Sequence, residues 1–266
     1  MLANDTIYVA GGVNGAEHSS SSVFTLNPAT GDVAPAGSVP QPFHDAGGAV
    51  IGGRLFVFGG GPNEGTDAVQ AIDLESGKSR VVGRLPKPLS DLSAVSVGST
   101  VYLLGGYDGT APQAAIYATT DGLHFRTAGR LSRGLRYMAV ATAGNAVVVA
   151  GGISSSGPVS DVYLFDPGTG RVSLLGHLPS ALGHGSAFAI GGVVYVAGGQ
   201  DSKGRAVRQV VAVDPAARTI SRLAPLPTAL SDAAAVSDGS TAWLIGGWRG
   251  TALSQVLTVR VDQRSA

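Results

Sequence analysis

The stretch VYLLGGYDGTAPQAAIYATTDG, residues 101–122, consists of an apolar run, a glycine pair, a loop of small polar residues and a second apolar run. An apolar run ending in Gly-Gly occurs five more times in the chain. The six copies start 46 to 48 residues apart, at Ile7, Leu55, Val101, Val147, Val194 and Ala242. Self-similarity at such a regular period is typical of solenoids and propellers. The chain is therefore a six-fold repeat.

Each repeat contains four short segments of β-strand composition separated by turn residues. In the third repeat these segments begin at Asp91, Thr100, Ala114 and Leu123. Short strands with tight connections favour an antiparallel meander. One such sheet cannot bury both of its faces, whereas six sheets packed radially can. The pattern predicts an all-β fold, a six-bladed β-propeller with four-stranded antiparallel blades.

The repeats cover the whole chain, so we expect a single domain over residues 1–266, with repeats at approximately 1–42, 43–88, 89–134, 135–181, 182–229 and 230–266. Aligning the glycine pairs places Met1 opposite Ala49, and the last repeat stops near its third turn. The first and last blades are therefore expected to be incomplete. We expect the missing strands to be encoded upstream, together with a signal peptide or tether that would favour an extracytoplasmic or secreted location.

The composition narrows the range of partners. Charged residues make up 14% of the chain and their charges sum to zero, which gives no electrostatic basis for binding nucleic acid. No apolar stretch reaches the roughly 18 residues of a membrane span, so we expect no membrane insertion. Few Lys against many Arg, with abundant Ala and Gly, is typical of a GC-rich bacterial genome. We expect either a monomer or a part of a larger chain.

A double glycine after an apolar strand, repeated every 46 to 48 residues, resembles the kelch repeat. In that family the pair ends the second strand of each blade, where a bend leaves no room for a β-carbon and positive φ is often needed. Aromatic residues in this strand are expected to pack between blades: Tyr8, Phe56, Tyr102, Tyr195 and Trp243, with Val148 in the fourth copy. The family's Trp on the fourth strand is absent. The Arg that often opens the first strand is replaced at Phe43, Leu89, Leu135, Leu182 and Leu230.

No cofactor or metal site is expected. Gly77, Lys78 and Ser79 match the end of a phosphate-binding loop, but Ile72 occupies the position of its first glycine, so we interpret the segment as a hairpin turn. The five histidines show no spacing that sets two metal ligands on one element. The chain has no Cys, which excludes thiolate ligands and the Tyr–Cys cross-link of a kelch-type copper oxidase.

Candidate ligand-binding residues come from two sets of positions. Fourteen residues before each glycine pair, at the start of the innermost strand, stand Asp45, Asp91, Tyr137, His184 and Asp232, with His44 and Arg136 beside them. The loops after the pairs supply Asn14, Asn63, Tyr107, Asp108, Gln200, Asp201, Trp248 and Arg249. In kelch proteins both sets of loops lie on one face, around the central channel.

Two interpretations of these positions remain open. The repeated aspartates can shape the turn by accepting backbone N–H bonds. Tyr137 and His184 stand where the other repeats have Asp, and Arg136 stands beside Tyr137. These three residues are therefore the strongest candidates for ligand contact.

Function has to be argued from this face, because propellers host many activities. We expect a non-catalytic recognition module that binds a protein or a glycan, with no catalytic residues. The alternative is a carbohydrate-active enzyme resembling the six-bladed kelch sialic-acid mutarotases and epimerases. Such an enzyme needs a carboxylate or His as general acid/base and an Arg for the substrate carboxylate.

Overall fold

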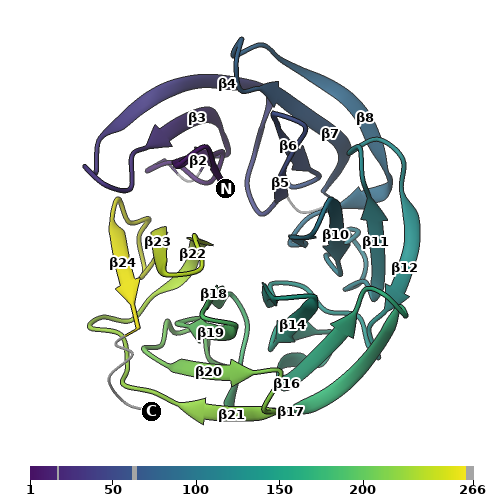
Figure 1. The fold of residues 1–266 in the computed structure, drawn as a ribbon, viewed down its shortest axis with the longest axis vertical. Helices are drawn as coiled ribbons and strands as arrows, with labels where there is room; N and C mark the ends of the chain where they lie inside the picture. Colours follow the sequence, from purple (N-terminus) through teal and green to yellow (C-terminus); the bar gives the residue numbers. More distant parts are fainter. Residues whose placement is uncertain (17, 62–64, 262–266) are drawn as a thin grey trace. The chain divides into compact units, whose positions relative to one another are not determined.

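The computed structural model describes residues 1–16, 18–61 and 65–261. Every regular element in these ranges is a β-strand (Figure 1). No helix long and apolar enough to cross a membrane occurs in the described ranges. The prediction of an all-β chain is confirmed.

The strands form six antiparallel sheets, and the chain divides into two compact units, Met1–Arg136 and Tyr137–Ala266. In the first unit the sheets contain, in order, β1 (Leu2–Ala3), β2 (Thr6–Ala10), β3 (Ser20–Leu26) and β4 (Val33–Phe43); β5 (Gly47–Ile51), β6 (Arg54–Phe58), β7 (Thr66–Asp73) and β8 (Ser79–Leu89); and β9 (Ser93–Val97), β10 (Thr100–Leu104), β11 (Ala115–Thr119) and β12 (Arg126–Arg130). The four segments predicted for the third repeat are therefore confirmed.

The second unit also holds three sheets. Their strands are β13 (Ala139–Ala143), β14 (Ala146–Ala150), β15 (Ile153–Ser154), β16 (Gly157–Asp166) and β17 (Arg171–Leu182); β18 (Ser186–Ile190), β19 (Val193–Ala197), β20 (Val210–Asp214) and β21 (Thr219–Arg222); and β22 (Ser231–Ser237), β23 (Thr241–Trp248) and β24 (Val256–Arg260). The extra strand β15 is a short hairpin on β16. Six successive meanders of this kind are the blades of a β-propeller. As predicted, the end blades are incomplete: β1 has two residues, and the last blade has three strands in the described ranges.

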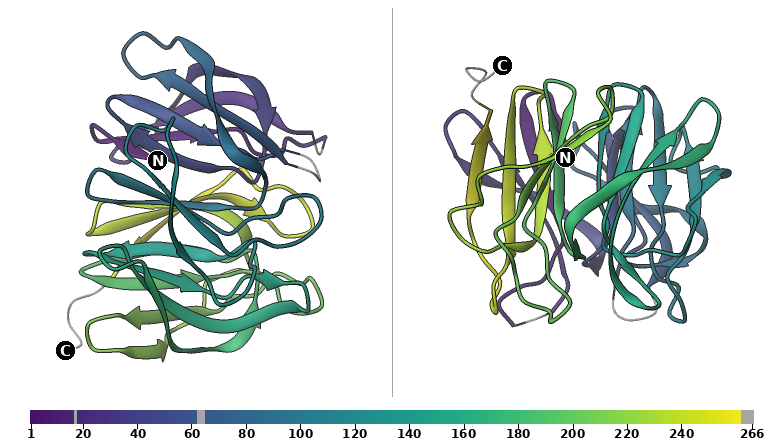
Figure 2. Two further views of the ribbon diagram at one scale, coloured as in Figure 1. Left: turned by 90° about the vertical axis from the view of Figure 1, so that its right-hand side faces the viewer. Right: turned by 90° about the horizontal axis from the view of Figure 1, so that it is seen from below.

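Within each unit the cores lie between neighbouring blades. Phe56 and Val69 of the second blade pack with Val101 and Leu103 of the third. In the second unit, β13 contacts β18 and β18 contacts β22, each through the inner edge of its blade. The side views show the strands of each unit ending in loops at two opposite ends (Figure 2). The second strands of the inner blades, such as β10 and β14, are buried on both faces because neighbouring sheets cover them.

Each of the first five glycine pairs joins its blade to the segment that leads into the next blade. The N–H of the second glycine donates to the carbonyl of the residue that replaces the family's Arg, as in Gly60 to Leu89 (2.9 Å) and Gly199 to Leu230 (2.8 Å). Gly198 has φ +67°, and a β-carbon there would lie 2.1 Å from the carbonyl oxygen of Leu230. The pair is thus required by positive φ and by close backbone approach together.

Four of the five predicted aromatic residues of the second strand are buried in the core, and Tyr8 of the first blade is partly buried. Phe56, Tyr102 and Trp243 are at most 6% exposed, and Val148 is fully buried in the copy that lacks an aromatic residue. The rings of Tyr195 and Phe188 are stacked with centroids 5.6 Å apart. Aromatic pairs of this kind stabilise the contact beyond the area they bury.

Gln70 connects the first two blades from a fully buried position on β7. Its Oε1 accepts the backbone N–H of Gln41 at 2.7 Å, and its Nε2 donates to the Gln41 carbonyl at 3.1 Å. Gln209 occupies the same position of the fifth repeat. Its Oε1 accepts the Ser180 hydroxyl at 3.0 Å, and within the described residues its buried Nε2 has no partner.

We expect Gln70→Leu to lower the free energy of unfolding by about 2 kcal/mol, because the backbone N–H and C=O of Gln41 lose their hydrogen bonds to the Gln70 side chain. Gln209→Leu is the matched control. It should change stability by less than about 1 kcal/mol, since it removes an already unpaired nitrogen and the exposed Ser180 can bind water. Urea denaturation measures both. Equal losses would contradict the assigned role of Gln70.

Candidate functional site

The loops before the innermost strands meet the loops after the glycine pairs, as predicted, within individual blades. Ser90 and Tyr107 exchange backbone hydrogen bonds of 2.9 and 2.8 Å. Gly183 and Gln200 form the equivalent bridge in the second unit. Both predicted sets of loops therefore lie at the same end of their blade.

The five residues at the predicted strand entrances share a left-handed backbone. Their φ angles run from +52° to +58°, at Asp45, Asp91, Tyr137, His184 and Asp232. Asp and His tolerate this conformation better than other residues with a β-carbon, which accounts for the repeated choice of Asp. Tyr137 is bulky, so its φ of +53° is a strained exception.

These entrances are also linked along the backbone inside each unit. In the first unit, Asp91 donates its N–H to the carbonyl of Asp45 at 2.8 Å. In the second, His184 donates to Tyr137 and Asp232 donates to His184, both at 3.0 Å. The left-handed conformation therefore places each entrance in hydrogen-bond contact with the next one.

Side chains of the second unit form a connected cluster at this end. The rings of Tyr137 and His184 are stacked, with centroids 3.8 Å apart and an angle of 24° between planes. His184 Nδ1 lies 2.5 Å from Asp232 Oδ1. The side chains of His184 and Asp232 are 16% and 29% exposed. The pair is thus shielded but reachable from solvent.

The second oxygen of Asp232 is held by two polar neighbours. Oδ2 accepts the Ser231 hydroxyl at 2.7 Å and Gln200 Nε2 at 3.1 Å. A carboxylate bound at Nδ1 orients the His184 ring and leaves Nε2 as the nitrogen that can meet a ligand. We name Tyr137, His184, Asp232, Ser231 and Gln200 the histidine cluster.

The first unit holds a different arrangement. Arg136 Nη1 donates to Asp91 Oδ2 at 3.0 Å, and its guanidinium lies 4.6 Å from the centroid of the Tyr107 ring. Asp91 is buried, with a side chain 6% exposed. The Arg136 side chain therefore neutralises a buried carboxylate and covers an aromatic face.

The neighbouring loop carries a second ion pair. Lys87 Nζ lies 2.6 Å from Asp108 Oδ2 and also donates to Gln113 Oε1 at 2.9 Å. The hydrogen bond from Lys87, followed by those from Thr110 and Ala111, holds the pKa of Asp108 well below its usual range. Asp108 therefore stays ionised at any physiological pH.

Among the remaining predicted residues, Trp248 contacts the histidine cluster through its backbone. His44 Nδ1 is 2.8 Å from the Ser19 hydroxyl, and Asp45 is exposed. Trp248 accepts the Ser231 hydroxyl at its backbone oxygen (3.3 Å), and Arg249 is exposed beside it. The other predicted loop residues are Asn14 and Asp201, which organise their own loops, and Asn63, which lies outside the described residues.

The carboxylates of Asp91 and Asp232 contact side chains, and backbone bonds link successive entrances within each unit. Ser231 and Lys87 are absent from the predicted set. A signal for Ser231 exists, because Leu-Ser-Asp occurs at both 89–91 and 230–232, and both serines are buried. Within the described ranges, no three His, Asp or Glu residues come together as a metal site requires.

Comparison with known proteins matches one family profile to part of the chain and matches solved structures to nearly all of it. The kelch motif profile matches residues 134–179. The solved structure titled "Structure of YjhT" aligns with a TM-score of 0.86 and 16% sequence identity, over 98% of this chain and 93% of that one. At this identity the likeness shows the fold alone. A search of curated protein sequences found no match.

Proposed function

Because the chain is a kelch-repeat β-propeller, we propose that it is a recognition module that binds a hydroxyl-rich glycan at the glycine-pair end of its blades. The observation that carries this proposal is the strained Tyr137, stacked on the hydrogen-bonded His184. Asp serves at three of the other four entrances without this strain, so an aromatic residue needs a separate reason.

The energetics support a role for Tyr137 beyond folding. A left-handed backbone at such a residue costs about 1 to 3 kcal/mol. Stacking on His184 offsets about 0.5 to 1.5 kcal/mol of that cost. Residues held in such a conformation cluster at binding sites. An aromatic face beside fixed polar groups suits a sugar, which has apolar C–H faces and many hydroxyls.

The charges favour a neutral glycan. The carboxylate of Asp232 in the histidine cluster is hydrogen-bonded to His184, Gln200 and Ser231. A carboxylate, an amide and a hydroxyl offer directed hydrogen bonds to sugar hydroxyls, and the carboxylate disfavours an anionic sugar. A peptide segment would not need this density of hydroxyl-binding groups around one aromatic ring.

A second candidate function is favoured by the His184–Asp232 pair. A carboxylate on Nδ1 is the arrangement that prepares Nε2 as a general base. With Arg249 of the same unit to hold a substrate carboxylate, the histidine cluster would suit an enzyme resembling the kelch sialic-acid mutarotases. We rank this function second because Arg249 makes no described side-chain contact with the cluster.

We expect a glycan array to identify a neutral oligosaccharide ligand, and Tyr137→Ala and His184→Ala each to weaken its binding roughly tenfold or more, as for central contacts in other interfaces. His124→Ala is the matched control, because His124 is also paired with an aspartate, Asp121, at 2.6 Å, but in the turn between β11 and β12. Calorimetry should give the same affinity for this control as for the unsubstituted protein.

Absence of any glycan ligand, or equal weakening by His124→Ala, would refute glycan recognition by the histidine cluster. NMR of anomer exchange of N-acetylneuraminic acid separates the second function. Acceleration by the unsubstituted protein, lost in His184→Ala, would replace the recognition module with the enzyme.

A further inference from the structure

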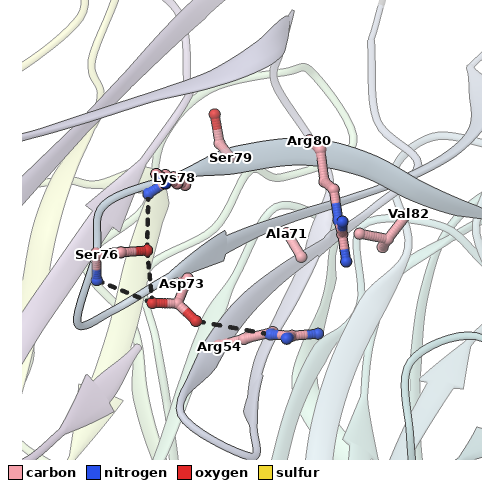
Figure 3. Close-up of a pocket in the computed structure, with 8 residues that line it drawn as sticks. All are labelled: Arg54, Ala71, Asp73, Ser76, Lys78, Ser79, Arg80 and Val82. Atoms are coloured by element: carbon pink, nitrogen blue, oxygen red, sulfur yellow. Dashed lines mark hydrogen bonds and ion pairs between the residues drawn. The ribbon is translucent and has the colours of Figure 1, made fainter.

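A cationic cleft lies at the opposite end of the second blade from the glycine pair (Figure 3). It has a volume of about 470 Å³ and includes Arg54, Asp73, Ser76, Lys78 and Arg80 in its lining. The five-residue strand β6 begins at Arg54 and ends just before Gly59, so about 16 Å of strand separates the cleft from the entrance loops. The cleft is thus a separate surface.

The strand register explains why these side chains share one face. Arg54 pairs with Asp73 across β6 and β7, and Ala71 pairs with Arg80 across β7 and β8. Asp73 and Ala71 are two residues apart, so all four project from the same side of the sheet. Figure 3 shows the Arg54 and Arg80 side chains extending into the same space.

The charge of the cleft is positive. Three cations face one carboxylate, and that carboxylate is engaged in its own turn, since Asp73 Oδ1 accepts the N–H and the hydroxyl of Ser76 at 2.9 and 2.8 Å. These bonds lower the pKa of Asp73. Its Oδ2 lies 3.8 Å from Arg54 Nε, a loose ion pair. Within the described part of the chain, neither Lys78 nor Arg80 has a carboxylate partner.

A cleft at the same place on the fourth blade shows which feature is specific to the second blade. It has a volume of about 500 Å³ and includes Asp166, Arg171 and Arg218. The register places Ala146 where the second blade has Arg54, and Ser173 where it has Arg80. The repeat therefore forms the cleft, whereas the two facing guanidinium groups belong to the second blade.

We propose that the cleft of the second blade binds a tetrahedral oxyanion, a phosphate or sulfate group. Two guanidinium groups on one face offer paired N–H donors with the geometry that such oxygens accept, and Lys78 adds a mobile ammonium donor. The hydroxyl of Ser76, in the turn beside Asp73, already donates to that carboxylate and can accept from a protonated ligand. The segment Gly77-Lys78-Ser79 takes part as a hairpin turn and not as a phosphate-binding loop.

The test is an NMR titration of the full chain with sodium sulfate and with sodium phosphate, at constant ionic strength kept with chloride. We expect saturable shifts of the amide signals of Arg54, Lys78 and Arg80. Arg80→Gln and Arg54→Gln should each weaken binding roughly fivefold, as for an exposed charge-assisted contact. Glucose 6-phosphate, added as a separate ligand, distinguishes a free anion from the same group carried on a sugar.

Arg84→Gln is the matched control, because Arg84 lies on the same strand β8, carries the same charge and is paired with Asp67 outside the cleft. It should change the affinity for the anion by less than about twofold, because it removes a nearby positive charge but no direct contact with the anion. Equal weakening by Arg84→Gln, or shifts spread over the surface without saturation, would overturn the proposal. Because all three arginines are exposed, the melting temperature should not change.

Discussion

Gly198→Val is expected to lower the free energy of unfolding by about 4 kcal/mol or more, the largest effect of any substitution considered. A β-carbon at Gly198 would lie 2.1 Å from the carbonyl oxygen of Leu230, and backbone cannot move aside cheaply. The residue also has φ +67°, where a β-branched side chain is strained. Moving the Leu230 segment would break the 2.8 Å bond from Gly199 that joins two blades.

The control for this prediction is Gly144→Val in the turn between β13 and β14. Gly144 has φ +59°, but a β-carbon there would meet nothing within 4 Å. This substitution should cost only the conformational strain, about 1 to 2 kcal/mol. Guanidinium denaturation of both variants separates close approach from positive φ. If the two losses are equal, the inter-blade contact is not what requires the glycine.

Arg136→Met should lower the free energy of unfolding by about 3 kcal/mol, because it leaves the buried Asp91 carboxylate without its cationic partner. The Asp91 side chain is only 6% exposed, and the Arg136 guanidinium 3.0 Å away also covers the ring of Tyr107. Adding Asp91→Asn to Arg136→Met removes the unpaired charge. The double variant should therefore recover most of the loss.

Arg84→Met measures how much an exposed ion pair contributes to the free energy of unfolding. Arg84 also contacts a carboxylate at 2.8 Å, but its side chain is 78% exposed. We expect a change of less than about 1 kcal/mol. Urea denaturation of the three variants tests whether Arg136 is a structural partner or a ligand contact. A stability unchanged by Arg136→Met would return Arg136 to the candidates for ligand binding.

The sequence predicted the positions of the candidate site's residues but not their side-chain partners. Counting fourteen residues back from each glycine pair finds every left-handed entrance, including Tyr137 and His184. The partners of those residues do not follow from the count. Arg136 reaches back 45 residues to Asp91, whereas His184 reaches forward 48 residues to Asp232. Each partner lies about one repeat away, and the direction depends on the rotamer of one side chain.

The sequence by itself determined the number of blades, the order of their strands and the positions of the bends. These features repeat six times, and they rest on local chemistry: apolar runs form strands, and paired glycines occupy positive φ. Only the tertiary structure decided which polar groups are paired and which surface carries charge. Arg54 and Arg80 come together because antiparallel register places them on one face of the second blade. Register and side-chain direction arise from packing between segments distant in the chain, so no local pattern encodes them.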